Sequence, residues 1–192
     1  MKVYDAILSR RSIRRFQQKE ISIDLLKKFV NAARIAPSAA NLQPLEFFVV
    51  TDKELRAKVF KTLGWAAYIK PTWFPDEKER PMAYIIIIVK NHEKNSWYVR
   101  DSSFAAENIM LTAEGEGIGS CILCKVDGEK LHDILKLPKE YHVDSVIALG
   151  YRSENPVIVD MQDNNVEYWR DENEILHVPK RKLEDIIHLN KF

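Results

Sequence analysis

The residues best suited to chemistry lie near the N-terminus, where the sequence RRSIRRF occupies positions 10–16. This arginine segment carries four guanidinium groups within six residues, and no carboxylate lies between Asp5 and Glu20. Because like charges at this density repel one another, an anionic partner would relieve them, and guanidinium forks match phosphate oxygens through paired hydrogen bonds. Ser12 adds a hydroxyl donor. The segment predicts a site for the phosphate of a small ligand, with a solvated basic surface as the alternative.

A second candidate is the loop APSAANLQP at residues 36–44, in which two prolines bracket one hydroxyl and two side-chain amides. These polar side chains belong to Ser38, Asn41 and Gln43. Amides offer both donors and acceptors, which suits the alternating carbonyl and N–H groups at the pyrimidine edge of a flavin. The two small alanines between them would let a planar ring approach. An ordinary polar turn is the alternative.

A glycine-rich stretch, GEGIGSCILC, occupies residues 115–124. Its spacing is not GxGxxG, and it follows an expected helix, whereas the dinucleotide-binding fingerprint follows a strand. A Rossmann-type site is therefore unsupported. The glycines could end the helix, bring backbone N–H groups close to a ligand, or do both.

Metal chemistry has little support in the sequence. Cys121 and Cys124 form a lone C-x-x-C pair. If both lie in one strand, residues three apart point to opposite faces, which prevents shared ligation or a disulfide. The five histidines are scattered without the spacing of metal ligands. We expect no metal site.

A second basic group, formed by Lys180, Arg181 and Lys182, lies far from the arginine segment along the chain. It could close on the same phosphate. The alternative, which the sequence alone favours, is a solvated turn before the final amphipathic segment.

Length and composition predict one folded domain over residues 1–192. The 29 basic and 28 acidic side chains leave a formal charge of +1, too balanced for whole-surface attraction to nucleic acid or to an anionic membrane. The apolar runs fall far short of the about 20 residues that a membrane-spanning helix needs. The N-terminal residues lack the pattern of a signal peptide. We expect no nucleic-acid or membrane partner, and a cytoplasmic location.

Hydrophobic periodicity predicts the helices and strands that position these groups. Helices are expected near residues 3–10, 22–36, 55–63, 102–114 and 131–135. Strands are expected at 47–50, 83–89, 121–126, 143–149 and, at a sheet edge, 157–159. The strand at 83–89 is apolar on both faces, so it should be central and covered by helices on each side. Residues 65–81 should be irregular, and the whole should form an α/β or α+β sheet layered by helices.

Five motifs occur in a recognisable order: RRSIRRF, APSAANLQP, a D-x-x-x-A-x-x-N segment (residues 101–108) leading into EGEGIGSCIL, LGYR, and VPKRKLEDIIH. Together they resemble the nitroreductase family of flavoproteins, in its short-chain branch, over nearly the whole chain. The resemblance implies an α+β fold with a mixed, largely antiparallel central sheet flanked by helices. It also implies an intertwined homodimer with two FMN sites at the interface. The chain departs from many relatives in having Leu45 where they have tryptophan.

The resemblance also assigns residues to the cofactor. Arg10 and Ser12 match positions that hold the FMN phosphate and ribityl chain, with Arg11 beside them. Arg14 matches the basic residue near the flavin N1 and O2, where a fixed cation stabilises the anionic reduced ring.

Three further groups complete the implied FMN site. Ser38, Asn41 and Gln43 match a loop that reaches FMN from the other subunit. The backbone of Ile122, Leu123 and Cys124 matches the stretch that faces the reactive edge of the ring. Lys180 and Lys182 match the distal phosphate ligands, with Arg181 as their replacement if the register differs by one.

The implied reaction is a ping-pong hydride transfer from NADH or NADPH through flavin N5 to a small acceptor, such as a nitroaromatic or a quinone. The cofactor does this chemistry, so we assign no residue as nucleophile or general base. One alternative is a specialised relative that fragments flavin, removes halogen or reduces an alkene. A non-catalytic module that binds nucleic acid or another phosphate ligand is a remoter alternative.

Overall fold

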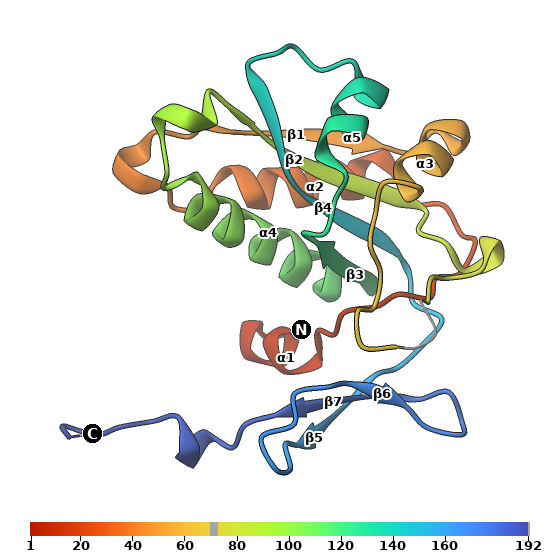
Figure 1. Ribbon diagram of the computed structural model, residues 1–192, viewed down its shortest axis with the longest axis vertical. Helices are drawn as coiled ribbons and strands as arrows, with labels where there is room; N and C mark the ends of the chain where they lie inside the picture. The colour runs from red at the N-terminus through yellow and green to blue at the C-terminus, as the bar shows by residue number, and fades with distance from the viewer. Residues whose placement is uncertain (70–72, 192) are drawn as a thin grey trace.

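A computed structural model describes residues 1–69 and 73–191. Its centre is a sheet of four strands, β1 (Leu45–Val50), β2 (Ala83–Lys90), β3 (Ile118–Leu123) and β4 (Tyr141–Tyr151). The strand order is β1-β2-β4-β3, and every neighbouring pair is antiparallel. Helices lie on both faces of this sheet (Figure 1). The predicted α+β architecture with an antiparallel central sheet is confirmed.

The central strand β2 is buried on both faces, as its composition predicts. Ile85 and Ile87 face helices α2 (Ile23–Arg34) and α4 (Tyr98–Gly115), whereas Tyr84 and Ile86 face α3 (Lys53–Phe60) and α5 (Gly128–Leu135). Each of these four side chains is at most 1% exposed. Burial of one such isoleucine contributes about 1.5–3 kcal/mol. The two apolar layers therefore fix the sheet between the helices.

Local signals set the ends of α2, the helix that leads into the polar loop. The Ser22 hydroxyl accepts a hydrogen bond from the Leu25 backbone N–H at 3.3 Å, which caps the N-terminus as predicted. The helix ends at Arg34, before Pro37. A shorter helix, α1 (Val3–Ser9), precedes the arginine segment and lies against α4.

The strand expected at 121–126 is wrong in its bounds, because β3 spans Ile118–Leu123. Gly117 adopts a φ of +72° in the turn after α4, a backbone conformation that glycine adopts without strain. Gly119 is already within the strand. A Cβ there would lie 2.9 Å from Cγ1 of Ile13. Gly119 therefore makes room for a side chain of the arginine segment, which explains it without a ligand.

A smaller sheet is formed by β5 (Val157–Asp160), β6 (Trp169–Arg170) and β7 (Leu176–Lys180), in the order β5-β7-β6. It lies below α1 in Figure 1, apart from the central sheet. Strand β5 is parallel to β7, and β6 is antiparallel to it. Pairing in this small sheet is therefore mixed, and a parallel bridge between Ser12 and Ser120 of β3 adds a parallel contact at the edge of the central sheet. The edge strand predicted at 157–159 is confirmed.

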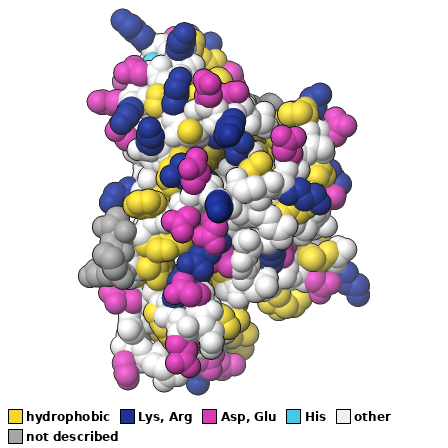
Figure 2. All heavy atoms as spheres, turned by 90° about the vertical axis from the view of Figure 1, so that its right-hand side faces the viewer, with side chains coloured by type: hydrophobic (Ala, Val, Ile, Leu, Met, Phe, Trp, Pro, Cys, Tyr) yellow, Lys and Arg dark blue, Asp and Glu magenta, His cyan; other side chains and the backbone are white. Residues whose placement is uncertain are grey.

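The remaining regular elements are short 3-10 turns. They are η1 (Ala39–Asn41), η2 (Glu77–Glu79), η3 (His92–Lys94) and η4 (Leu183–Asp185). The described part of residues 65–81 is irregular apart from η2, as predicted, and residues 70–72 lie outside the described residues. Among the described residues, no helix has the length and apolar character to cross a membrane. Acidic and basic side chains are interspersed on the face shown in Figure 2.

Substitution of Gly150 by alanine should destabilise the fold. Gly150 lies in β4, and a Cβ there would be 2.7 Å from Cδ1 of the buried Phe16. Overpacking of this kind costs about 1–3 kcal/mol. Gly115→Ala is the matched control, because apart from its chain neighbours and its own helix backbone no atom lies within 4 Å of the added Cβ. Urea unfolding monitored by circular dichroism measures both, and equal midpoints for the two variants would contradict the packing argument.

Candidate functional site

The arginine segment lies along the central sheet in an extended conformation. The Ile13 N–H donates to the Ser120 carbonyl at 2.9 Å, and the Gln17 N–H donates to the Tyr151 carbonyl at 2.8 Å. The side chains of Ile13 and Phe16 are completely buried, against Gly119 and Gly150. Alternation along an extended chain then leaves neighbouring arginines outside this apolar contact. The backbone of the segment is therefore fixed before any ligand is considered.

Arg10 and Arg11 have different environments. The Arg10 Nε lies 3.5 Å from the Glu107 carboxylate on α4, and no other hydrogen bond of its guanidinium to a described residue is present. Arg11 turns back to α1 and donates to the Leu8 carbonyl. Burial lowers the pKa of Arg11, and the neighbouring charge of Arg10 acts in the same direction. Arg10 is thus the more available of the two for an anion.

Ser12 and Arg14 lie beside β3. Ser12 forms a parallel β-bridge with Ser120 of β3. Burial raises the pKa of the Cys121 thiol, and the charges of Arg14 and Arg10 together with a hydrogen bond from Ser12 oppose this effect. The Arg14 Nε is buried without a hydrogen-bond partner among the described residues. Its guanidinium carbon lies 5.1 Å from the centre of the Tyr168 ring. Arg14 is therefore a held cation with an unused donor.

Glu154 holds the backbone of the arginine segment, and it is not among the residues predicted from the sequence. Its Oε1 accepts from the N–H groups of Arg14 at 2.5 Å and Arg15 at 3.2 Å. Its Oε2 forms a 2.6 Å ion pair with Arg170 of β6, and both side chains are at least 92% buried. The available signal was a single carboxylate between Asp144 and Asp160, directly after a buried strand.

Arg15 is engaged in ion pairs. It contacts the carboxylates of Glu174 at 2.7 Å and Glu79 at 3.4 Å, and its guanidinium lies 5.7 Å from the centre of the Trp73 ring. Arg170 lies on the same ring at 5.2 Å. Of the four arginines of the segment, Arg15 is therefore paired with two carboxylates of the fold. Arg10, Arg11 and Arg14 have no such pair.

The polar loop is stabilised in a strained conformation at the start of α4. The Ala39 N–H donates to the buried Asp101 carboxylate at 3.0 Å, and the Gln43 N–H donates to the Ser38 hydroxyl at 3.1 Å. Ala40, Asn41 and Gln43 all have φ near +50°, which is uncommon for residues other than glycine. Strain of this kind persists only where surrounding contacts impose it. The side chains of Asn41 and Gln43 are exposed.

The structure does not bring this loop to the arginine segment within one chain. Asp101, which holds the loop, lies six residues before Glu107, which contacts Arg10, along α4. Six helical residues correspond to about 9 Å. No hydrogen bond or ion pair joins the two segments within the described part of the chain. Ser38, Asn41 and Gln43 are thus separate from Arg10, Ser12 and Arg14 in the single chain.

Residues 122–124 mark the end of β3. Ile122 is half-buried on the α2/α4 face, Leu123 is buried on the α3/α5 face, and Cys124 is exposed just beyond the strand. Because Cys124 lies outside the strand, the expectation that both cysteines share it is wrong. The two thiols remain free.

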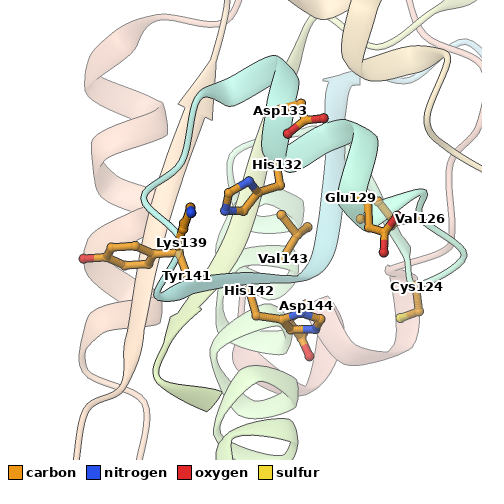
Figure 3. A pocket seen from close by; sticks show the side chains of 11 residues that line it. Cys124, Val126, Glu129, His132, Asp133, Lys139, Tyr141, His142, Val143 and Asp144 are labelled. Atoms are coloured by element: carbon orange, nitrogen blue, oxygen red, sulfur yellow. The ribbon is translucent and has the colours of Figure 1, made fainter. Parts of the chain in front are cut away.

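A surface cavity of about 760 Å³ opens beside Cys124, between α5 and the start of β4. Figure 3 shows His132, His142 and Asp144 among the side chains that line it. The His142 ring stacks on that of His92 with centroids 4.4 Å apart. Burial lowers the pKa of His142, and the charge of His92 adds to this effect. No metal-ligating cluster of three such side chains occurs in residues 1–69 and 73–191.

The second basic group lies at the end of the small sheet. Lys180 is the last residue of β7, and Arg181 donates to the Asp185 carbonyl at 2.7 Å. Lys180, Arg181 and Lys182 are all exposed. No ion pair or hydrogen bond connects them with the arginine segment in the described residues, so their part in a phosphate site stays a prediction.

Comparison with known proteins agrees with this arrangement. A nitroreductase family model matches residues 7–151, which contain the arginine segment, the polar loop and the whole central sheet. A protein of Methanothermobacter thermautotrophicus named NADH dehydrogenase/NAD(P)H nitroreductase is 32% identical, and the match covers 88% of each chain. An iodotyrosine deiodinase of Thermotoga neapolitana is 26% identical over 78% of this chain and 88% of its own.

Among solved structures, an FMN-dependent nitroreductase of Clostridium difficile superposes with a TM-score of 0.69 at 26% identity. The superposition covers 97% of this chain and 98% of that one. The sequence match covers most of the chain, including the central sheet and the arginine segment that lies along it. The chain belongs to the nitroreductase family.

Proposed function

We propose that this protein is an FMN-dependent oxidoreductase that passes hydride from NADH or NADPH to a small acceptor, a nitroaromatic or quinone-like compound. The observation that carries the proposal is the arginine segment. It is fixed along the sheet by buried contacts, and it presents the free donors of Arg10 and Arg14 beside β3. The names of the relatives support the choice of cofactor and electron donor.

The residues present fit FMN. A buried guanidinium nitrogen without a partner is costly, and the Arg14 Nε is such an atom. A ligand carbonyl or an anionic ring nitrogen would satisfy it. Arg10 supplies donors for a phosphate, and Ser12 lies between the two arginines. When bound, FMN supplies the hydride-accepting ring, since no side chain of the protein accepts hydride.

The chain's own residues position the cofactor and polarise it. Glu154 holds the Arg14 and Arg15 N–H groups, and Tyr168 supports the Arg14 guanidinium. A cation fixed in this way favours negative charge that develops beside it and needs no reorganisation during the reaction. Arg14 therefore tunes the cofactor site, and no side chain is assigned as acid, base or nucleophile.

A homodimer would complete the site. No hydrogen bond or ion pair joins the polar loop to the arginine segment within the described chain, and in the proposed dimer Ser38, Asn41 and Gln43 contact the FMN of the second copy. Large apolar side chains are exposed on α1, at Val3, Tyr4 and Leu8, and on α4 at Phe104. These side chains support the proposal that α1 and α4 contribute to the contact between the two copies.

Arg10→Ala should weaken FMN binding about 10- to 100-fold, because a charged hydrogen bond is worth about 1.5–3 kcal/mol. Fluorescence titration of flavin-free protein with FMN measures this change. Lys58→Ala is the control, since Lys58 is an exposed cation on α3. Equal FMN affinities for Arg10→Ala and the wild type would remove Arg10 from the phosphate site.

Glu154→Gln should weaken FMN binding and destabilise the fold by about 3–5 kcal/mol, because Arg170 is left buried without its carboxylate. Glu174→Gln is the matched control: its side chain is 61% exposed and pairs with Arg15, so it should cost less than about 1 kcal/mol. Chemical unfolding and FMN titration of both variants test this. A Glu154 variant as stable as the Glu174 variant contradicts the assigned role.

Mixed dimers test the shared site. A subunit carrying Arg10→Ala and a subunit carrying Asn41→Ala should together form one intact site and one doubly damaged site. FMN titration of the purified heterodimer should then show about half the wild-type number of tight sites. Two weakened sites and no site of wild-type affinity would show that Arg10 and Asn41 act within one chain.

A further inference from the structure

A small basic cavity lies between α3, β2 and residues 77–81, and it shares no residue with the arginine segment. Its volume is about 90 Å³. The polar side chains that line it belong to Gln18, Lys53, Arg56, Glu77, Arg80 and Tyr84. Three are cations and one is a carboxylate, so the lining carries an excess of two positive charges.

Arg56 is fixed in place by backbone carbonyls. Its Nε donates to the Thr51 carbonyl at 3.0 Å, and its Nη1 donates to the Pro81 carbonyl at 3.0 Å. The Nη2 makes no hydrogen bond to a described residue. No carboxylate of the described chain forms an ion pair with Arg56. Its charge is therefore held at the cavity without neutralisation.

Arg80, like Arg56, forms no ion pair with a carboxylate of the described residues. Its Nε is buried and has no hydrogen-bond partner in residues 1–69 and 73–191. The guanidinium carbon lies 4.3 Å from the centre of the Phe60 ring, which supports one face of the group. Glu77, the only carboxylate in the cavity lining, forms no ion pair with Arg80 or with any other described residue.

Tyr84 supplies a neutral donor from the floor of the cavity. The residue is 1% exposed, and it is among the residues that line the cavity. Burial raises the pKa of Tyr84, while the charges of Arg56 and Arg80 act in the opposite direction. The phenol therefore keeps its proton and can donate it in a hydrogen bond.

We propose that this cavity is a binding site for a phosphate-sized oxyanion, held by the guanidinium groups of Arg56 and Arg80 and by the Tyr84 hydroxyl. Donors from three separate elements suit the oxygens of a tetrahedral anion, and Lys53 adds charge at the rim. The cavity volume of about 90 Å³ suits a group of the size of a single phosphoryl group. Buried donors that the fold leaves unsatisfied are the groups that a bound anion satisfies.

Occupation of the cavity would stabilise the support of the arginine segment. Glu79, the neighbour of Arg80, accepts a hydrogen bond at its carbonyl from the Phe16 N–H and pairs with Arg15 through its carboxylate. Gln18 donates to the Arg80 carbonyl at 3.0 Å. An anion that binds α3, β2 and residue 80 together would thus stabilise the residues whose hydrogen bonds and ion pair support residues 15–18.

The test measures the melting temperature of FMN-saturated protein in sodium phosphate and in sodium chloride of equal ionic strength. Under the proposed function, FMN at saturation occupies the arginine segment, so the remaining response belongs to other sites. Phosphate at about 50 mM should raise the melting temperature by several degrees, with half the effect at millimolar concentration. No shift beyond that of chloride would overturn the proposal. The same shift is expected in Arg10→Ala protein without FMN, so the test is separable from the proposed flavin chemistry.

Three variants locate the response. Tyr84→Phe removes only the hydroxyl and should weaken phosphate binding about three- to tenfold, and Arg80→Gln should weaken it at least about tenfold. Lys58→Gln, on α3 but outside the cavity, should leave it unchanged. Isothermal titration with phosphate measures all three. Wild-type affinity in both Tyr84→Phe and Arg80→Gln would place the phosphate elsewhere and overturn the proposal.

Two further titrants define the ligand class. Acetate at equal ionic strength should produce less than about half of the phosphate shift, and an equal shift would overturn the tetrahedral assignment. Glycerol phosphate separates the two sources of the anion. Stabilisation by inorganic phosphate alone supports the free ion, and stabilisation by both supports a phosphoryl group carried by a larger ligand.

Discussion

Ile13 and Phe16 are buried at two places where the central sheet carries no side chain of its own. Gly119 of β3 and Gly150 of β4 leave this space, and a Cβ at either position would collide with the incoming residue. Close-packed interiors allow such contacts in one arrangement only. The depth and direction of the arginine segment follow from this apolar contact, so the positions of its four guanidinium groups depend on two completely buried side chains.

Carboxylates then determine which arginines remain available. Glu79 and Glu174 engage the Arg15 side chain, while Glu154 takes the backbone N–H groups beside it and neutralises Arg170. In a partly buried setting each uncompensated cation is costly. The fold accepts this cost at Arg14, where the Nε has no partner among the described residues. The Nε atoms of Arg15 and Arg170 also lack a hydrogen-bond partner, but both of those guanidinium groups pair with carboxylates, whereas no ion pair of Arg14 occurs within the described residues.

The sequence was sufficient for the elements with strong local signals. The apolar residues of β2 predicted a central strand, and Ser22 and Pro37 predicted the limits of α2. The start of β3 could not be predicted, because no local preference of Gly119 shows that Ile13, from a distant segment, packs against it. Glu154 escaped for a related reason, since its partners are 140 and 16 residues away. The residues of the candidate site were recognisable in the sequence. Which of the arginines are paired with carboxylates depends on tertiary contacts.

The hydrogen bond between Arg15 and Glu174 joins residues 159 positions apart. The arginine segment also depends on residues 79, 120 and 151–154, so its contacts span nearly the whole chain. Contacts of such large sequence separation form late, because loop closure must come first. During synthesis the N-terminal arginines emerge from the ribosome long before β3, β4 and β6 exist. The observed arrangement of the arginine segment is therefore a product of the completed polypeptide, and an N-terminal fragment ending before Glu154 lacks the carboxylate that holds the Arg14 and Arg15 N–H groups.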